Sequence, residues 1–308
     1  MLHFVEGMKQ NEISQRMNLS PSKVNRLISQ GKNLGMVKIS IESPFQSLVE
    51  LEHKLVGVGG LSDAVVAPAV SGSQETTLQQ VGRAAGNQLL QSLRDRDVIA
   101  ITGGKAISAV VENLQPERKF DVTVVPLTGG VQGKFYTDVN HLASRLAERL
   151  GGRALLLHAP LFAESAVQRH LLREMAPVRE VFDLARRAAI ALVGIGSILT
   201  PGSSYYDLHP LPDLDRDELV HKGICGEFLA HLICADGSVA DHPLNERLVA
   251  LTPAEIAHCR RVIGVAAGPA KVQPIRSALR GRFLHTLVTD EETASGVLEA
   301  LEPVRNVA

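Results

Sequence analysis

The stretch Ile99-Ala-Ile-Thr-Gly-Gly-Lys105 is an aliphatic segment that runs into two glycines and a predicted helix. An aliphatic segment also runs into a glycine loop and then a helix in Val125-Pro-Leu-Thr-Gly-Gly-Val-Gln132 and in Val262-Ile-Gly-Val-Ala-Ala-Gly-Pro-Ala-Lys271. Short aliphatic segments of this kind are typical of strands that are buried on both faces of a parallel sheet. Ligands of open α/β sheets bind beyond the carboxyl ends of the strands, so we expect these three loops to share one binding edge.

Around these loops, predicted strands alternate with predicted helices from about residue 60 to the end of the chain. This alternation predicts a doubly wound α/β domain. Residues 197–247 are rich in Gly, Pro, Asp and His and are expected to form long loops near a site. The expected strands are 64–67, 98–101, 122–126, 154–158, 189–193, 262–266 and 286–289, and the expected helices are 78–93, 106–114, 139–150, 165–175, 270–279 and 291–301.

The first forty residues have a different, helical pattern. Gln10–Met17 predicts one short helix, and Ser20 with Pro21 is a suitable start for a second helix that runs through Ser29. Apolar and polar residues then alternate over 36–41, which predicts a strand. We therefore expect a winged helix-turn-helix DNA-binding domain over 1–42, a linker helix within 43–56, and the α/β domain over 57–308.

The second helix of a helix-turn-helix enters the major groove with its early residues against the base edges. Arg and Lys suit guanine, Asn suits adenine, and Ser suits a base or a phosphate. Polar residues near helix N-termini commonly hold phosphates. The alternative is a helical hairpin with a solvated polar face. The candidate DNA-binding residues are Ser22, Lys23, Asn25 and Arg26 for bases and Gln10 and Ser20 for phosphates.

Charge and composition agree with a small basic head on a larger body. Residues 1–42 carry six lysines or arginines and three glutamates, whereas the whole chain has a net charge of −1. The three cysteines form no CxxC pair, which indicates a reducing compartment. No apolar run approaches the roughly 18 residues of a membrane span, and no secretion signal opens the chain. We expect a cytoplasmic protein with no membrane partner.

Gln10–Ile13, Leu19–Ser20, Lys23–Leu27 and Gly35–Ile39 resemble the head of the SorC family of sugar-responsive transcriptional regulators. The resemblance continues through the three glycine loops to the C-terminus. It implies that the α/β domain is similar in fold to sugar-phosphate isomerases and binds a phosphorylated sugar as effector. Asn25 stands where the family usually has Ser, an exchange expected to change the base preference.

The glycine loops are the candidate phosphate site. Glycines let backbone N–H groups approach an anion, and the following helix N-terminus adds a positive dipole. The alternative for any one loop is a turn that only changes the direction of the chain. The candidate residues are Thr102, Gly103, Gly104 and Lys105 as the phosphate cradle, Thr128, Gly129, Gly130 and Gln132 as a second wall, and Gly268 with Lys271 in the third loop.

The segment 223–247 resembles a further family stretch, with Glu227 where Asp is more usual. The resemblance implies that this carboxylate accepts sugar hydroxyls. The alternative is a carboxylate at a helix start, where the helix dipole favours it. Arg247 is a candidate anion ligand, with a structural ion pair as the alternative.

An enzyme and a metal site are the competing hypotheses. Lys105, Lys134 or Lys271 could form a Schiff base with an aldehyde sugar, but no acid–base pair can be placed beside them, so we assign no catalytic residue. A second alternative is an assembly module. The loop residues His209, Asp213, Asp215 and His221 match no metal-ligand spacing, so we expect no metal and no cofactor.

The sequence therefore predicts a transcriptional regulator of a carbohydrate or polyol catabolic operon. Its expected partners are operator DNA and a phosphorylated sugar or polyol. A homodimer or homotetramer is expected, because two-fold symmetric proteins read two half-sites. The alternative is a sugar-phosphate-converting enzyme of isomerase-like fold.

Overall fold

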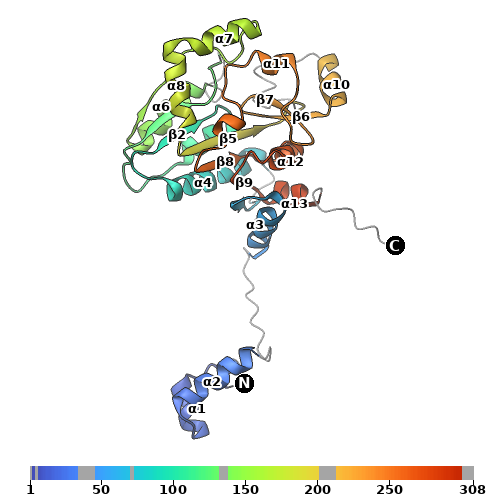
Figure 1. Ribbon diagram of the computed structural model, residues 1–308. Coiled ribbons are helices and arrows are strands. Elements are labelled where there is room, and N and C mark those ends of the chain that lie inside the picture. Colours follow the sequence, from blue (N-terminus) through green and yellow to red (C-terminus); the bar gives the residue numbers. More distant parts are fainter. Residues whose placement is uncertain are drawn as a thin grey trace, which may run out of the picture. The chain divides into compact units, whose positions relative to one another are not determined.

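The computed structural model describes residues 2–3, 6–33, 46–69, 73–131, 138–200 and 213–299 (Figure 1). The chain divides into two compact units, Met1–Gln46 and Ser47–Ala308.

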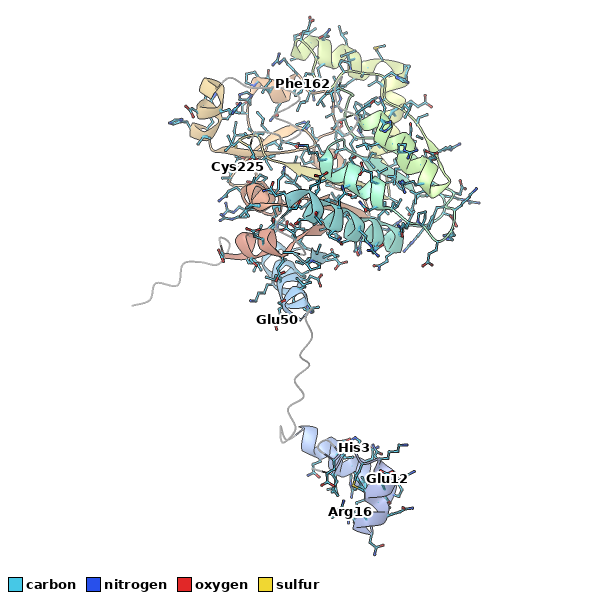
Figure 2. All side chains as sticks on the ribbon, turned by 180° about the vertical axis from the view of Figure 1, so that it is seen from behind. His3, Glu12, Arg16, Glu50, Phe162 and Cys225 are labelled. Atoms are coloured by element: carbon cyan, nitrogen blue, oxygen red, sulfur yellow. The ribbon has the colours of Figure 1, made fainter. Side chains whose placement is uncertain are left out.

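The first unit contains two helices joined by a short turn. Helix α1 (Gln10–Met17) has the predicted bounds, and α2 (Pro21–Asn33) runs four residues further than expected. Asn18 ends α1 in a left-handed conformation, and the Ser20 hydroxyl accepts a hydrogen bond from the Lys23 amide, as expected of a helix cap. Figure 2 shows Glu12 and Arg16 along α1. The strand expected at 36–41 lies outside the described residues.

The second unit is built on a parallel sheet with the strand order β1-β9-β8-β5-β2-β3-β4. Its seven strands pair in parallel throughout, which confirms the α/β prediction. The long strand β5 lies at the centre of this order. The strands are β1 (Asp63–Ala67), β2 (Val98–Ile101), β3 (Thr123–Pro126), β4 (Arg153–Ala154), β5 (Ile190–Gly196), β8 (Arg261–Val265) and β9 (Thr286–Asp290).

Helices cover both faces of this sheet, so that it has two hydrophobic cores. Along β5, Ile190 and Leu192 belong to one core, and Ala191, Val193 and Ile195 belong to the other, as the alternation of side chains along a strand requires. One core is closed by α4 (Gln74–Ser92), α5 (Lys105–Asn113) and α6 (Val139–Leu150). The other is closed by α3 (Gln46–Gly59), α8 (Ala176–Arg186), α12 (Val272–Arg280) and α13 (Glu291–Glu299). Helix α7 (Ala166–Glu174) precedes α8.

The expectation of long loops over 197–247 is wrong for the part that the structure describes. A hairpin of β6 (Ile224–Phe228) and β7 (His231–Cys234) lies there, flanked by α10 (Asp213–His221) and α11 (Pro243–Glu246). Strand β6 pairs with the end of β5, where Gly196 lies opposite Glu227. Glu227 is therefore on a strand and not at a helix start.

Gly82 brings α4 into close contact with α5, the helix that begins at the first glycine loop. A Cβ atom on Gly82 would lie 2.6 Å from the carbonyl carbon of Ala109. Because this neighbour is backbone, no side-chain rotation relieves the clash. We expect Gly82→Ala to lower the free energy of unfolding by about 1–3 kcal/mol, as measured by chemical denaturation.

Gly57→Ala in α3 is the matched control, because a Cβ there would meet no atom within 4 Å. Alanine is the better helix former, so this variant is expected to gain up to about 1 kcal/mol. Equal stability of the two variants would contradict the packing of α4 on α5.

Candidate functional site

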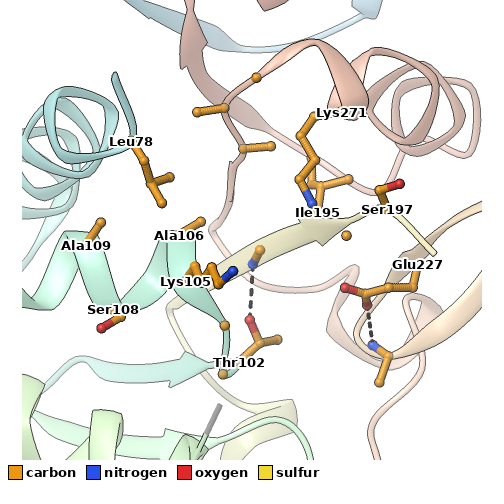
Figure 3. Close-up of a pocket in the computed structure, with 18 of the residues that line it drawn as sticks. Leu78, Thr102, Lys105, Ala106, Ser108, Ala109, Ile195, Ser197, Glu227 and Lys271 are labelled. Carbon is orange, nitrogen blue, oxygen red and sulfur yellow. Dashed lines mark hydrogen bonds between the residues drawn. The ribbon is translucent and has the colours of Figure 1, made fainter. Parts of the chain in front are cut away.

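A pocket of about 720 Å³ opens at the carboxyl ends of β2, β5 and β8 (Figure 3). This volume lies within the roughly 300–1,000 Å³ of small-molecule sites. The pocket is at the sheet edge that the glycine loops predicted. The predicted residues that line it are Thr102, Gly103, Gly104, Lys105, Thr128, Gly129, Glu227, Gly268 and Lys271.

Three predicted residues do not join this group. Gly130 and Arg247 are absent from the described lining, and Gln132 lies outside the described residues. The Gly130 amide donates a hydrogen bond to the carbonyl of Ala159 at 2.8 Å, so this amide has a structural role. Arg247 follows α11, and its carbonyl accepts from the Ala163 amide at 2.9 Å.

The first glycine loop leads directly into α5. Gly104 precedes this helix with a φ of 115°, and no side chain caps the helix start. The first-turn amides and the positive end of the helix dipole therefore face the pocket edge. The Thr102 hydroxyl accepts a hydrogen bond from the Gly194 amide at 3.1 Å, which leaves its own proton available for donation into the pocket (Figure 3).

The glycines of the other two loops have a structural part. The Gly129 amide donates to Val249 O at 2.7 Å, and a Cβ on Gly129 would lie 2.6 Å from the carbonyl carbon of Pro160. The Gly268 amide donates to Asp290 Oδ2 at 2.8 Å and to Thr293 Oγ1 at 2.9 Å. These two amides are already engaged by the protein. The helical turn that follows Gly268 has no side-chain cap, as is also the case for α5.

Two lysines and one glutamate meet in the pocket. Figure 3 shows Lys105 on α5 and Lys271 after β8 directed toward the end of β5, with Glu227 close by on β6. Burial raises the pKa of Glu227 to about 7, although the charge of Lys271 and a 2.9 Å hydrogen bond from the Ala230 amide both favour the carboxylate. Burial lowers the pKa of Lys271, and Lys105 lowers it further, while Glu227 raises it.

Gly196 makes room for the Glu227 side chain, because a Cβ at Gly196 would collide with the Glu227 carboxylate. The lining also includes Gly194, Gly196 and Ser197, which the sequence analysis missed. The sequence does contain a signal for these residues, because an aliphatic strand runs into Gly-Ile-Gly-Ser, as in the three predicted loops.

The remaining wall is formed by one face of α4 and one face of α5. The sequence analysis missed these residues, because helical spacing shows that they share a face but not that this face borders a pocket. They are Gln74, Glu75, Leu78 and Gln79 on α4 and Ala106, Ser108, Ala109 and Glu112 on α5.

The family model described as "Putative sugar-binding domain" matches residues 43–299, which span the whole sheet and the pocket. The chain belongs to the SorC family of sugar-binding transcriptional regulators. The resemblance predicted from the sequence is confirmed.

Similar regulators match this SorC-family chain over nearly its whole length. The erythritol catabolism regulatory protein EryD of Brucella abortus (strain 2308) is 31% identical over 300 residues, which cover 96% of this chain and 94% of the relative. The sorbitol operon regulator of Klebsiella pneumoniae is 27% identical, with coverage of 97% and 95%. The crystal structure of full-length SorC from Klebsiella pneumoniae matches with a TM-score of 0.78, 27% identity and 96% coverage of both chains. This chain is accordingly a transcriptional regulator, and the enzyme alternative is not supported.

The described residues contain neither a metal-binding cluster nor a membrane-spanning helix. They contain no group of three or more His, Cys, Asp or Glu that could hold a metal ion. Of the four metal candidates, His209 and the side chains of Asp213 and Asp215 lie outside the described part, and His221 Nδ1 bonds to Asp217 O at 2.6 Å. None of the described helices is long and apolar enough to span a bilayer.

Proposed function

We propose that the pocket binds a phosphorylated sugar or polyol and that this effector controls the binding of the head to operator DNA. The observation that carries the proposal is the convergence of Lys105 and Lys271 beside the uncapped start of α5. Charge-assisted bonds from the ammonium groups and the helix dipole suit a phosphate. Thr102 and Glu227 then suit the hydroxyl groups of the same ligand. The Thr102 hydroxyl can donate a hydrogen bond to a ligand oxygen, and the Glu227 carboxyl oxygens can accept one from a ligand hydroxyl.

We propose that the controlled operon serves carbohydrate or polyol catabolism. Support comes from the relatives, which are named for erythritol catabolism and for a sorbitol operon. The regulator would act in the cytoplasm, where the operator is.

The head is proposed to be a winged helix-turn-helix with α2 as its recognition helix. Val24 is 3% exposed and faces α1, so the opposite side of α2 is left to the solvent. Gln10 and Ser20 lie at or beside the two helix starts, where phosphates are held. The exposed polar residues on the early part of α2 are Ser22, Lys23, Asn25 and Arg26.

The regulator is proposed to act as a homodimer or homotetramer on a pseudo-palindromic operator, because two-fold symmetric proteins read two half-sites. Coupling between effector and operator needs only about 1–3 kcal/mol, a roughly 5- to 150-fold change in operator affinity.

A thermal-shift screen of the purified protein tests the effector class. The panel contains sugar phosphates, polyol phosphates and their unphosphorylated parents. A rise in the melting temperature with a phosphorylated compound, and none with its parent, is the expected result. Stabilisation by the unphosphorylated parent alone would overturn the assignment of Thr102–Lys105 as a phosphate cradle.

Effector binding is expected to depend on pH through Glu227. Below its pKa of about 7 the carboxyl group is neutral, and above it the group carries a negative charge that repels the phosphate. The second pKa of a phosphate ester is near 6. As the pH rises toward that value the phosphate gains a second negative charge, which strengthens its binding to the lysines. The affinity should therefore peak between about pH 6 and 7 and then fall by up to roughly tenfold per pH unit.

Isothermal titration calorimetry from pH 5.5 to 8.5 measures this profile. The groups that act on Glu227 are Lys271 and the Ala230 amide. Burial and the charge of Lys105 lower the pKa of Lys271, so Glu227→Gln is the variant that separates the part of Glu227 from that of Lys271. In Glu227→Gln the loss of affinity above pH 7 should be much smaller. An equally steep fall in Glu227→Gln would show that another group causes it.

A further inference from the structure

The third glycine loop is held in place by a buried polar network. The Gly268 amide donates to Asp290 Oδ2 at 2.8 Å and to Thr293 Oγ1 at 2.9 Å. The Thr293 hydroxyl in turn donates to Asp290 Oδ2 at 2.6 Å, and the Thr293 amide donates to Asp290 Oδ1 at 3.0 Å. Asp290 is 2% exposed and Thr293 is 0% exposed. Buried polar groups are costly to leave without a partner, so this network fixes Gly268.

Gly268 in turn fixes the position of Lys271. Its carbonyl accepts a hydrogen bond from the Lys271 amide at 2.9 Å, which closes the short helical turn Pro269–Lys271. Lys271 lines the pocket. A cap on the start of α13 needs only the bond between Asp290 Oδ1 and the Thr293 amide. The bonds to Gly268 do more than a cap, because they join the loop after β8 to the start of α13.

The same network is joined to α3, the helix at which the second unit begins. Asp290 is the last residue of β9 and lies opposite Ala67 of β1. The amide of the adjacent Val66 donates to Glu52 Oε1 on α3 at 2.9 Å. A single strand pair therefore separates the Asp290 network from a side chain of α3.

Apolar packing makes a second connection between α13 and α3. Ala294 and Val297 of α13 belong to the same hydrophobic core as Leu48 and Leu55 of α3. Figures 1 and 2 both show the two helices side by side. Protein cores are closely packed and have low compressibility, so a displacement of α13 is passed on to its neighbours.

We propose, on the basis of the function proposed above, that Asp290 and Thr293 are positioning residues that hold the Lys271 loop on α13 and transmit effector binding to α3. An anion that pulls on Lys271 moves a loop that is tied at Gly268, so β9 and α13 move with it. Helix α3 is the element of the second unit that follows the head in the chain. A change in α3 is therefore the change that reaches the DNA-binding unit.

Hydrogen–deuterium exchange of the full-length protein tests this link without an effector. Thr293→Val keeps the shape of the side chain and removes the hydroxyl that binds Gly268 and Asp290, while the backbone cap on α13 stays. Exchange should become faster in both 266–272 and 46–59 by roughly threefold or more, the factor that corresponds to the loss of one buried hydrogen bond. Thr293→Ser keeps the hydroxyl and should stay within about twofold of the wild type.

Thr289→Val is the matched control. Thr289 is also 0% exposed, and its hydroxyl has no hydrogen-bond partner among the described residues. Its removal costs no hydrogen bond, so exchange should not become faster. Three results for Thr293→Val would overturn the inference: no change in exchange, a change confined to 266–272, or an equal change in 139–150, which packs in the other core. The last result would show a general loss of stability.

The response of the operator affinity to an effector is the second measurement. Fluorescence anisotropy with labelled operator is recorded with and without sorbitol 6-phosphate and erythritol 4-phosphate, the phosphates of the polyols for which the relatives are named. A compound that changes the operator affinity of the wild type should have a roughly threefold or more smaller effect on Thr293→Val. Its effect on Thr293→Ser and Thr289→Val should match the wild type.

The two proposals fail in different ways. An equal response of Thr293→Val and the wild type would overturn the inference but not the proposed function. No response of the wild type to these or to any other phosphorylated compound would overturn the proposed function, and the exchange experiment would still decide whether Thr293 links the loop to α3.

Discussion

Arg26→Ala is expected to lower the affinity for the operator by roughly 5- to 150-fold, the loss of about 1–3 kcal/mol that follows removal of a base-reading arginine. Arg26 is exposed on the early part of α2, and the neighbouring Val24 fixes the orientation of this helix by packing against α1. The loss should be much smaller on unrelated DNA, because phosphate contacts carry no sequence information. Fluorescence anisotropy with labelled operator and a scrambled duplex measures both affinities.

Arg16→Ala is the matched control in the same unit. It removes the same charge from α1, where the Arg16 guanidinium pairs with Glu6 at 3.2 Å (Figure 2). It should weaken both duplexes by a similar, smaller factor. Arg26→Ala should leave effector binding unchanged, since the pocket belongs to the other unit. Parallel loss of operator and effector binding in Arg26→Ala would contradict two separate sites.

Lys271→Met is expected to weaken effector binding by roughly 30-fold or more, because truncating one partner of a desolvated charge pair costs about 2 kcal/mol or more. Methionine keeps an unbranched chain that is one atom shorter, and it removes the ammonium group with its charge and its hydrogen-bond donors. Without Lys271 the pKa of Glu227 should rise above its value of about 7, because this lysine favours the ionised form. The pocket then holds a neutral carboxyl group in place of two opposite charges, so the fold should persist.

Lys222→Met is the control for this variant. Lys222 is exposed and pairs with Glu218 at 2.6 Å outside the described lining of the pocket. Its replacement should change the effector affinity less than twofold, as measured by calorimetry at pH 7. A similar loss in both variants would mean that overall charge, and not the pocket lysine, attracts the effector.

The parallel sheet could be predicted from the sequence because most of its strands are short aliphatic runs that alternate with helical segments. Strand β2 has the predicted bounds, and β5 and β8 differ from prediction only at their ends. The binding edge followed from the same pattern, since the carboxyl ends of parallel strands share one edge. Strand β4 pairs over only two residues, Arg153 and Ala154, where five were expected.

The β6–β7 hairpin could not be predicted in this way. Its turn is made by Leu229 and Ala230, with φ of 53° and 62°, a conformation that Asn and Gly normally indicate. An aliphatic run without these residues favours a helix by its composition. The position of Glu227 opposite Gly196 depends on this hairpin, so the carboxylate could be proposed as a ligand but not placed beside Lys271.

The functions of the individual glycines also required the structure. Gly104 and Gly268 both have a positive φ and both precede a helical turn, so their sequence patterns are alike. Only the structure shows that the Gly268 amide is engaged by Asp290 and Thr293. Which helix faces border the pocket likewise depends on how α4 packs on α5.

The most direct test of the account is the operator affinity of the wild type and of Lys271→Met, each with and without the phosphorylated compound that stabilises the wild type. The predicted result is a roughly 5- to 150-fold change in operator affinity for the wild type and little or no change for Lys271→Met at the same effector concentration. An equal change in both proteins, or no change in the wild type, would contradict control of the head by an anion held at Lys271.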